Sequence, residues 1–186
     1  MAAGALPRRS LSGVLVAGAI AAGKTTVAEL LAHDIDADLV KVRVALAEVL
    51  RISERDRTQL QERGADLDKR TNGRWLLEYL ELQLEQSNSS VVVDSLRTKR
   101  QTIPILEHHP SMYLVYLDAR LATRSARFNE SRGLDPVKSS MAFAEAMRHP
   151  TETGVTQLRD MAHLVIDTDD LSPQAVVAEV RGRFNL

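Results

Sequence analysis

The sequence predicts an α/β fold: a three-layer α/β/α sandwich around a five-stranded, mainly parallel sheet. Three observations predict it. Short apolar runs suited to buried strands alternate with stretches of helical periodicity, an order typical of parallel sheets covered by helices on both faces. The first apolar run leads directly into a glycine-rich loop and a helix. The chain of 186 residues, 44% of them apolar, is also long enough for one domain with a full core.

Five strands are expected, one for each short apolar run. The clearest is the continuous run Val91, Val92 and Val93, which fits a strand covered on both faces. The intervals between successive runs leave room for helical connections, as a parallel sheet requires. In chain order, the expected strands cover residues 13–17, 38–42, 91–93, 112–117 and 163–166.

Helices are expected between these strands. Val27, Leu30 and Leu31 give the first helix an apolar face at positions i, i+3 and i+4, and Pro173 opens the last helix. Residues 132–149 are polar and are expected to be irregular, with one apolar cluster around Phe143. In chain order, the expected helices cover residues 24–33, 45–51, 54–65, 74–86, 99–108, 119–130, 151–161 and 173 onward.

The domain is expected to span residues 11–186, after a short flexible tail at residues 1–10. Arg8 and Arg9, followed by a short apolar run, also resemble a twin-arginine export signal. Cleavage after such a signal would remove the glycine-rich loop. An export signal also leaves the Gly-Lys-Thr-Thr at 23–26 unexplained, so the tail is the favoured interpretation.

Composition narrows the classes of partner. The net charge of -1 and the aromatic content of 4% speak against nucleic-acid binding, and no apolar run reaches the length of a membrane span. Cysteine is absent, which fits a reducing cytoplasm. We therefore expect a cytoplasmic protein with a small-molecule partner, no nucleic acid and no membrane. The oligomeric state stays open, because the leucine-rich helix at residues 76–84 suits either the core or a partner chain.

The glycine-rich loop carries the most specific pattern. Residues 18–25 read Gly-Ala-Ile-Ala-Ala-Gly-Lys-Thr, which matches the phosphate-binding P-loop G-x-x-x-x-G-K-[ST] between a strand and a helix. Loop amides and the helix N-terminus bind phosphate oxygens, while the lysine reaches the β- and γ-phosphates. The residues expected to bind the nucleotide are Gly18, Ala21, Ala22, Gly23, Lys24, Thr25 and Thr26.

Asp94 is the second candidate, because it ends the strand at residues 91–93. A carboxylate at that strand tip takes the Walker B position, where it and the Thr25 hydroxyl would hold Mg²⁺. An ordinary strand-ending Asp that caps a turn is the alternative. No Glu follows Asp94, which argues against motor-type ATPases, and the guanine-reading N-K-x-D of signalling GTPases is absent.

Arginines downstream suit phosphoryl transfer to a second substrate. Arg97 follows Asp94 closely, and arginines clamp phosphates bidentately. Arg124 and Arg127 lie three apart on one helix and precede Arg132, where a mobile segment would close over the nucleotide. A solvated basic helix face is the alternative for Arg124 and Arg127. The histidines are scattered, and the adjacent His108 and His109 are expected to cap a helix or face solvent.

These motifs together resemble the P-loop kinases that include adenylate kinase and other nucleoside monophosphate kinases, with dephospho-coenzyme A kinase as a relative. The resemblance implies a P-loop NTPase sandwich with ATP and Mg²⁺ as cofactors, acceptor-binding helices at about 43–87 and a lid at about 131–150. It implies that Lys24, Asp94, Arg124 and Arg127 are catalytic. It further implies acceptor contacts from Arg51, Arg97 and Arg132, with Arg43 or Arg74 as alternatives to Arg51, and an adenine-facing turn at Asp167 and Thr168.

The function expected first is therefore Mg²⁺- and ATP-dependent phosphoryl transfer to a small phosphorylated acceptor, a nucleoside or deoxynucleoside monophosphate. One alternative is a hydroxyl acceptor such as dephospho-coenzyme A, with Asp94 as general base. The other is a nucleotide-binding regulatory module without small-molecule turnover.

Overall fold

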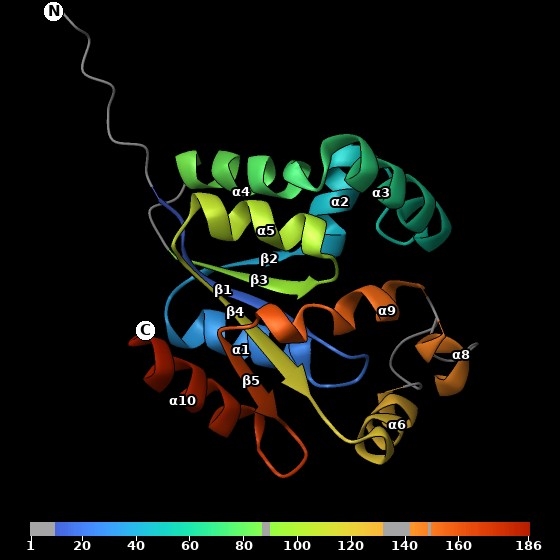
Figure 1. Cartoon of the computed structure of the whole chain (residues 1–186), viewed down its shortest axis with the longest axis vertical. Coiled ribbons are helices and arrows are strands. Elements are labelled where there is room, and N and C mark those ends of the chain that lie inside the picture. Colours follow the sequence, from blue (N-terminus) through green and yellow to red (C-terminus); the bar gives the residue numbers. More distant parts are fainter. Residues whose placement is uncertain (1–9, 87–89, 132–141, 149) are drawn as a thin grey trace, which may run out of the picture.

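One five-stranded parallel sheet forms the centre of the protein (Figure 1), with strand order β2-β3-β1-β4-β5. The computed structural model describes residues 10–86, 90–131, 142–148 and 150–186. Every strand pair is parallel, which confirms the predicted α/β sandwich. The strands are β1 (Ser12–Gly18), β2 (Asp38–Lys41), β3 (Val91–Leu96), β4 (Ser111–Asp118) and β5 (Leu164–Asp167).

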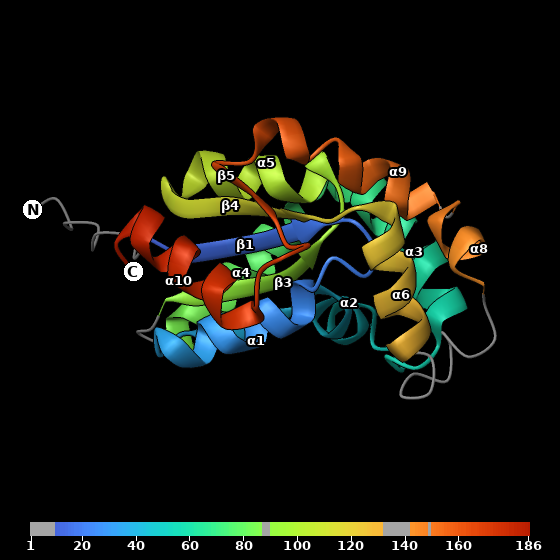
Figure 2. The same ribbon diagram turned by 90° about the horizontal axis from the view of Figure 1, so that it is seen from below.

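Helices cover both faces of this sheet (Figure 1). On one face lie α2 (Val42–Leu50), α3 (Arg57–Thr71), α4 (Arg74–Gln86) and α5 (Lys99–His108), and on the other lie α1 (Lys24–Asp34) and α10 (Pro173–Phe184). A third group gathers at the end of the sheet where β1, β3 and β4 finish, as both views show (Figure 2). It comprises α6 (Leu121–Glu130), α8 (Phe143–Met147) and α9 (Pro150–Thr156).

Two apolar cores result from the alternation of side chains along the strands. Leu15 and Ala17 of β1 belong to the core beneath α2, α4 and α5. Val14 and Val16 point to the opposite face and belong to the core beneath α1 and α10. Because successive strand residues face opposite sides, β1 is continuously apolar from Val14 to Ala17, as expected for a strand covered on both faces.

The observed elements differ from the expected ones at several ends, most at α3 (Arg57–Thr71), which begins three residues and ends six residues later than the helix expected at 54–65. Val42 begins α2 instead of ending β2, and β3 continues through Asp94 to Leu96. Within the stretch expected to be irregular, residues 143–147 form the short helix α8. Residues 132–141 and 149 of that stretch, like most of the N-terminal tail, lie outside the described residues. The expected helix at 151–161 divides into α9 and a 3-10 turn at Arg159–Met161.

The leucine-rich helix α4 faces the core. Leu76, Leu77 and Leu80 are at most 1% exposed and belong to the first core, while Leu82 is 58% exposed. The side chain of Leu84 lies outside the described residues. The buried leucines are thus explained by packing within one chain.

A buried polar cluster holds α3, α4 and α5 together. Asp68 of α3 accepts a hydrogen bond from the Trp75 indole at 2.6 Å and hydrogen bonds from the Gln101 amide at 3.0 and 3.1 Å. All three residues are buried. Such a carboxylate is tolerated in a core because its oxygens are hydrogen-bonded.

His109 takes one of the two roles expected for it. It caps α5, as one of the two expected roles had it, but it is only 5% exposed. Its Nδ1 accepts a hydrogen bond at 3.1 Å from the backbone N–H of Leu11, at the entrance to β1. Its Nε2 lies 3.4 Å from Oε1 of Glu81 but outside hydrogen-bond geometry. The ring therefore connects α5 to the start of the central strand.

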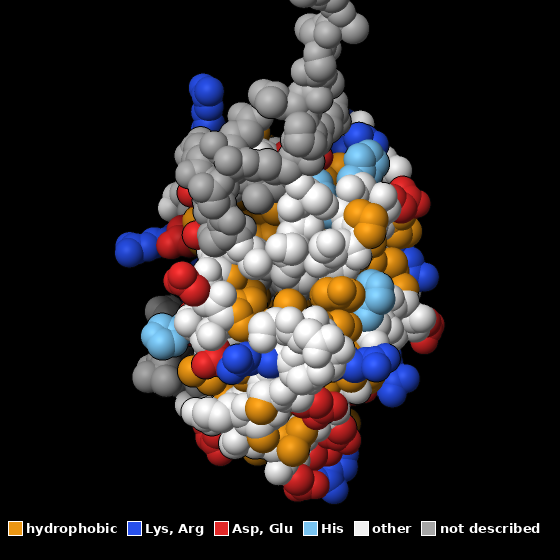
Figure 3. Space-filling view, turned by 90° about the vertical axis from the view of Figure 1, so that its left-hand side faces the viewer, with side chains coloured by type: hydrophobic (Ala, Val, Ile, Leu, Met, Phe, Trp, Pro, Cys, Tyr) orange, Lys and Arg blue, Asp and Glu red, His pale blue; other side chains and the backbone are white. Residues whose placement is uncertain are grey.

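The edge where the strands begin has a mixed surface. Figure 3 looks onto it and shows acidic, basic, histidine and hydrophobic side chains interspersed. Among the helices of the described residues, none combines the length and apolar character needed to cross a membrane.

Candidate active site

The P-loop adopts a conformation suited to anion binding. Ala21 (φ 60°) and Gly23 (φ 91°) both have left-handed backbone geometry. Gly23 caps α1 and has no side chain that could accept a hydrogen bond from the first helical amides. Amides at a helix N-terminus bind phosphate oxygens in such loops, so this geometry fits the predicted phosphate site, whose binding residues stay predictions.

The two glycines of the motif are required for different structural reasons. A Cβ at Gly18 would lie 2.2 Å from the carbonyl oxygen of Leu117, so this glycine permits the close approach of β4. A Cβ at Gly23 would meet no described atom within 4 Å. Gly18 is thus required both by the packing of the sheet and by its own positive φ of 147°, whereas Gly23 is required by its positive φ alone and borders open space.

Lys24 lies at the start of α1 with its side chain folded along the loop. Its Nζ donates a hydrogen bond to the carbonyl oxygen of Ala19 at 2.8 Å. This contact holds the ammonium group beside the loop amides, where it adds positive charge to the anion site.

Asp94 lies beside the P-loop, as its position at the strand tip predicts. The Thr25 hydroxyl donates to Asp94 Oδ2 at 2.9 Å, and the Ser95 hydroxyl donates to Oδ1 at 2.8 Å. Asp94 itself is 4% exposed. A buried carboxylate next to a hydroxyl is a pair of oxygen ligands that suits Mg²⁺.

Ser95 is a site residue that the sequence analysis missed. The register between β1 and β3 shifts here, because Val16 pairs with Asp94 while Ala17 pairs with Leu96. Ser95 is the extra residue of this β-bulge and has φ 71°. No local pattern marks a bulge at a serine, since it arises from pairing with a distant strand.

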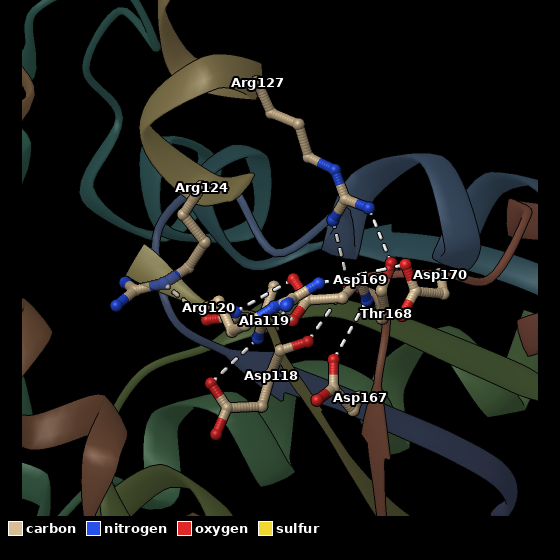
Figure 4. A network of polar contacts seen from close by, with 9 residues as sticks. All are labelled: Asp118, Ala119, Arg120, Arg124, Arg127, Asp167, Thr168, Asp169 and Asp170. Atoms are coloured by element: carbon tan, nitrogen blue, oxygen red, sulfur yellow. Dashed lines mark hydrogen bonds and ion pairs between the residues drawn. The ribbon is translucent and has the colours of Figure 1, made fainter. Parts of the chain in front are cut away.

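Thr168 joins the P-loop to the end of the sheet (Figure 4). Its hydroxyl lies 3.2 Å from the carbonyl oxygen of Ala22 and 3.0 Å from that of Asp118. The Arg127 guanidinium donates to the Thr168 hydroxyl at 2.9 Å and to the Thr168 carbonyl at 2.6 Å. The turn at Asp167 and Thr168, which the resemblance assigns to adenine, therefore lies against the P-loop. Arg127 is connected to the P-loop through Thr168.

Arg124 and Arg127 come from the same helix, yet their side chains reach different groups (Figure 4). Arg124 donates through Nε to the carbonyl oxygen of Ala119 at 3.0 Å, at the beginning of α6. Their predicted contacts with the transferred phosphoryl group stay predictions.

Arg97 follows the end of β3 and contacts Glu152, which in turn contacts the P-loop. Its Nη1 lies 3.5 Å from Oε1 of Glu152, and its side chain is 45% exposed. Oε2 of Glu152 accepts a hydrogen bond at 2.9 Å from the backbone N–H of Ile20 in the P-loop. Glu152 is the second site residue that the sequence analysis missed, because nothing in its local sequence points to residue 20.

The other acceptor candidates that the structure describes are exposed. Arg51 and Arg74 are exposed, and Arg43 lies 3.6 Å from Glu54 in an exposed ion pair. Arg132 lies outside the described residues. The contacts thus join Lys24, Thr25, Asp94 and Arg97 to the P-loop region, and the choice among Arg51, Arg43 and Arg74 stays open.

A surface hollow of about 320 Å³ lies at the opposite edge of the sheet, where it is lined by Tyr113, His163, Arg183, Phe184 and Asn185. Tyr113 lies near the start of β4, whereas the P-loop follows the end of β1. The hollow is therefore separate from the phosphate-binding loop, and the candidate site is defined by its polar groups.

The fold and these polar groups define a P-loop protein with a kinase-like architecture. Shikimate kinase from Bacteroides thetaiotaomicron is similar over 96% of this chain and 100% of its own, with a TM-score of 0.69 and 13% identity. Shikimate kinase from Aquifex aeolicus is similar over 92% of this chain and 95% of its own, with a TM-score of 0.60 and 12% identity. These likenesses concern the fold.

The family is identified by a second comparison. The profile of the RapZ-like N-terminal domain matches residues 78–185, more than half of the chain, and the chain belongs to this family. A "Nucleotide-binding protein" of Haemophilus influenzae is 29% identical over 106 residues, which cover 53% of this chain. The chain spans little more than a third of that relative, since the match covers 37% of its length.

Together, the family, the relatives and the fold support a nucleotide-binding site of the P-loop kinase type. They leave the acceptor, and the nucleoside monophosphate kinase subtype expected from the sequence, open.

Proposed function

We propose that this protein transfers the γ-phosphoryl group of ATP to a small anionic acceptor, in first place a nucleoside or deoxynucleoside monophosphate. The observation that carries the proposal is the hydrogen bond of 2.9 Å between Thr25 and Asp94, which lies directly beside the P-loop. In the reaction the bond between the γ-phosphorus and the β–γ bridging oxygen breaks. A bond forms to an acceptor oxygen, and ADP leaves.

The residues divide this work between them. The loop amides and Lys24 bind and orient the donor phosphates, which lowers the entropic part of the barrier. Arg97 is exposed enough to receive an anionic acceptor beside the loop. The Thr168 hydroxyl contacts the carbonyl oxygens of Ala22 and Asp118, which ties the P-loop to the turn after β5 and helps to hold the donor site in one geometry.

Magnesium fits the oxygen atoms present. Within the described residues no three His, Asp or Glu side chains gather into a metal cluster, and Asp94 with Thr25 gives one carboxylate and one hydroxyl. This small set suits Mg²⁺ held partly by substrate phosphates and water, in contrast to an all-protein cage. When bound, Mg²⁺ would neutralise charge on the transferred phosphate. The two hydroxyl hydrogen bonds orient Asp94 for that contact.

The test is ATP consumption with Mg²⁺ against all ribo- and deoxynucleoside monophosphates, dephospho-coenzyme A and common sugar acids. Nucleoside diphosphate formed from one or a few monophosphates, with equal ADP, is the expected result. If a compound with a hydroxyl group is phosphorylated instead, with an equal amount of ADP formed, the acceptor is a hydroxyl compound and not a monophosphate. Shikimate kinase and gluconokinase, which share this fold, support that replacement as the second kinase candidate.

A regulatory nucleotide-binding role is the other candidate. It is supported by the relatives, which are named only as nucleotide-binding proteins. Tight ATP binding without turnover on any acceptor would favour this role over the kinase.

A further inference from the structure

Glu152 is held in the active site by the packing of α9. Val155 and Leu158, just after Glu152, are at most 1% exposed and belong to the first core. A Cβ at Gly154 would lie 3.2 Å from the carbonyl oxygen of Arg97, so α9 lies close to the end of β3. This anchoring directs the carboxylate of Glu152 toward the P-loop.

The carboxylate connects two groups that have affinity for phosphate. Oε2 accepts from the Ile20 N–H at 2.9 Å, and Oε1 lies 3.5 Å from the Arg97 guanidinium. The side chain of Glu152 is only 12% exposed. P-loop amides and arginines bind phosphate oxygens in the sites where they occur. The Glu152 carboxylate therefore occupies, on both the Ile20 amide and the Arg97 guanidinium, the position that a phosphate oxygen would take.

A donor phosphate cannot share this position with Glu152 at low cost. Like charges a few ångström apart repel strongly where solvent is largely excluded. The backbone N–H of Ile20 has a single proton to donate. A phosphate oxygen that accepts this proton would therefore have to replace the Glu152 carboxylate.

We propose that Glu152 is a resident anion of the P-loop, which the donor phosphates displace and which couples the donor site to the acceptor site. Displacement from Ile20 also removes the partner of Arg97 and makes that guanidinium available. Conversely, an acceptor anion on Arg97 loosens Glu152 and raises donor affinity, because coupling between two sites is reciprocal. The coupling rests on the proposed function, whereas the displacement requires only that the P-loop binds polyphosphate.

The experiment measures dissociation constants of a non-hydrolysable ATP analogue, inorganic tripolyphosphate and adenosine for the full chain. Glu152→Gln removes the charge, and Glu152→Ala removes the carboxylate entirely. Glu179→Gln, an exposed position on α10, makes the same change of charge away from the site. Thermal unfolding of each variant shows that it is folded.

Both Glu152 variants are expected to bind the analogue and tripolyphosphate about fivefold or more tightly than the natural protein, within the range typical of coupled sites. Adenosine affinity should not change, and Glu179→Gln should match the natural protein. Equal or weaker polyphosphate binding by the Glu152 variants would overturn the proposal.

The role of Arg97 has its own readout. Arg97→Ala should raise affinity for the analogue when Glu152 is present, because the carboxylate loses its second partner, and should give no such gain in the Glu152→Gln background. The same change in both backgrounds would overturn the coupling. Failure of the proposed kinase activity appears separately, as absence of phosphoryl transfer in the acceptor panel while these binding differences persist.

Discussion

The Thr25 hydroxyl donates to the Asp94 carboxylate at 2.9 Å although the two residues lie 69 positions apart in the chain. Thr25 is the last residue of the P-loop motif after β1, whereas Asp94 lies near the end of β3, and β1 and β3 are neighbours in the sheet. Parallel strands bring their carboxyl ends to one edge, where ligands of such sheets bind. This pair is the basis for the assigned metal position.

Replacement of Asp94 by Asn should separate magnesium binding from folding. Asn keeps an acceptor for one hydroxyl but removes the charge that favours a divalent cation, so turnover should fall at least about 100-fold. Mg²⁺ should also cease to strengthen nucleotide binding. Binding with Mg²⁺ and with chelator gives this readout. Asp66→Asn, at an exposed position on α3, is the control. A variant that retained full Mg²⁺ dependence would contradict the assignment.

Lys24→Ala should abolish turnover while leaving the fold intact. The ammonium group contacts the loop at Ala19, and loss of a preorganised positive group at a phosphate site costs at least about 100-fold in rate. The measurement is the initial rate with the best acceptor, together with the urea midpoint as a check of folding. Comparable turnover in this variant would refute a P-loop mechanism.

The two motif glycines should differ in their effect on stability. Gly18→Ala places a Cβ 2.2 Å from the Leu117 carbonyl oxygen and forces β1 and β4 apart, which should cost about 3 kcal/mol of the free energy of unfolding or more. Gly23→Ala meets only the penalty of its positive φ, about 1–2 kcal/mol. Urea denaturation measures both. Equal losses would show that Leu117 is not the reason for Gly18.

Asp68→Ala should destabilise the helical layer that includes α3, α4 and α5. Removal of the carboxylate leaves the Trp75 indole and the Gln101 amide buried without their acceptor. Each unsatisfied buried donor costs roughly 1–3 kcal/mol. Asp66→Ala, two residues earlier and exposed, is the matched control for urea denaturation. A loss no larger than that of the control would mean that these donors find other partners.

Stability should fall below neutral pH because of His109. Burial lowers the pKa of His109 below its ordinary value of 6.5, although the Glu81 carboxylate opposes this and His108 reinforces it. Below pH 6.5 the unfolded chain takes up a proton that the folded protein refuses, so the unfolded state is favoured as pH falls. The stabilisation is complete above pH 6.5 and disappears as pH falls through the folded-state pKa.

The measurement is the free energy of unfolding between pH 5 and 8 for the natural protein and His109→Asn. One proton contributes at most about 1.4 kcal/mol per pH unit, and the variant should have a slope smaller by up to that amount. Because the two proteins differ only at residue 109, the difference in slope isolates His109. Identical slopes would contradict the assignment.

Most of the fold could be predicted because its features are local. The run Val91–Val93, the periodicity after Lys24 and the glycines of the loop each depend on neighbours within a few residues. The boundaries that shifted, at Val42 and Leu96, lie where packing against another element overrides local preference. The capping role expected for His109 is confirmed, but its contact with Leu11 could not be predicted, because Leu11 is distant in the chain.

For the candidate site, the sequence by itself predicted which groups would bind phosphate and which oxygens would hold magnesium, since the P-loop motif and the strand-ending Asp94 are local patterns. Only the tertiary structure decided that Ser95 forms a bulge opposite β1 and donates to Asp94, that Thr168 contacts the P-loop, and that Glu152 bridges Ile20 and Arg97. These contacts join segments that are far apart in the chain or depend on strand register. Their distances follow from how the strands and helices pack, which no short stretch of sequence specifies.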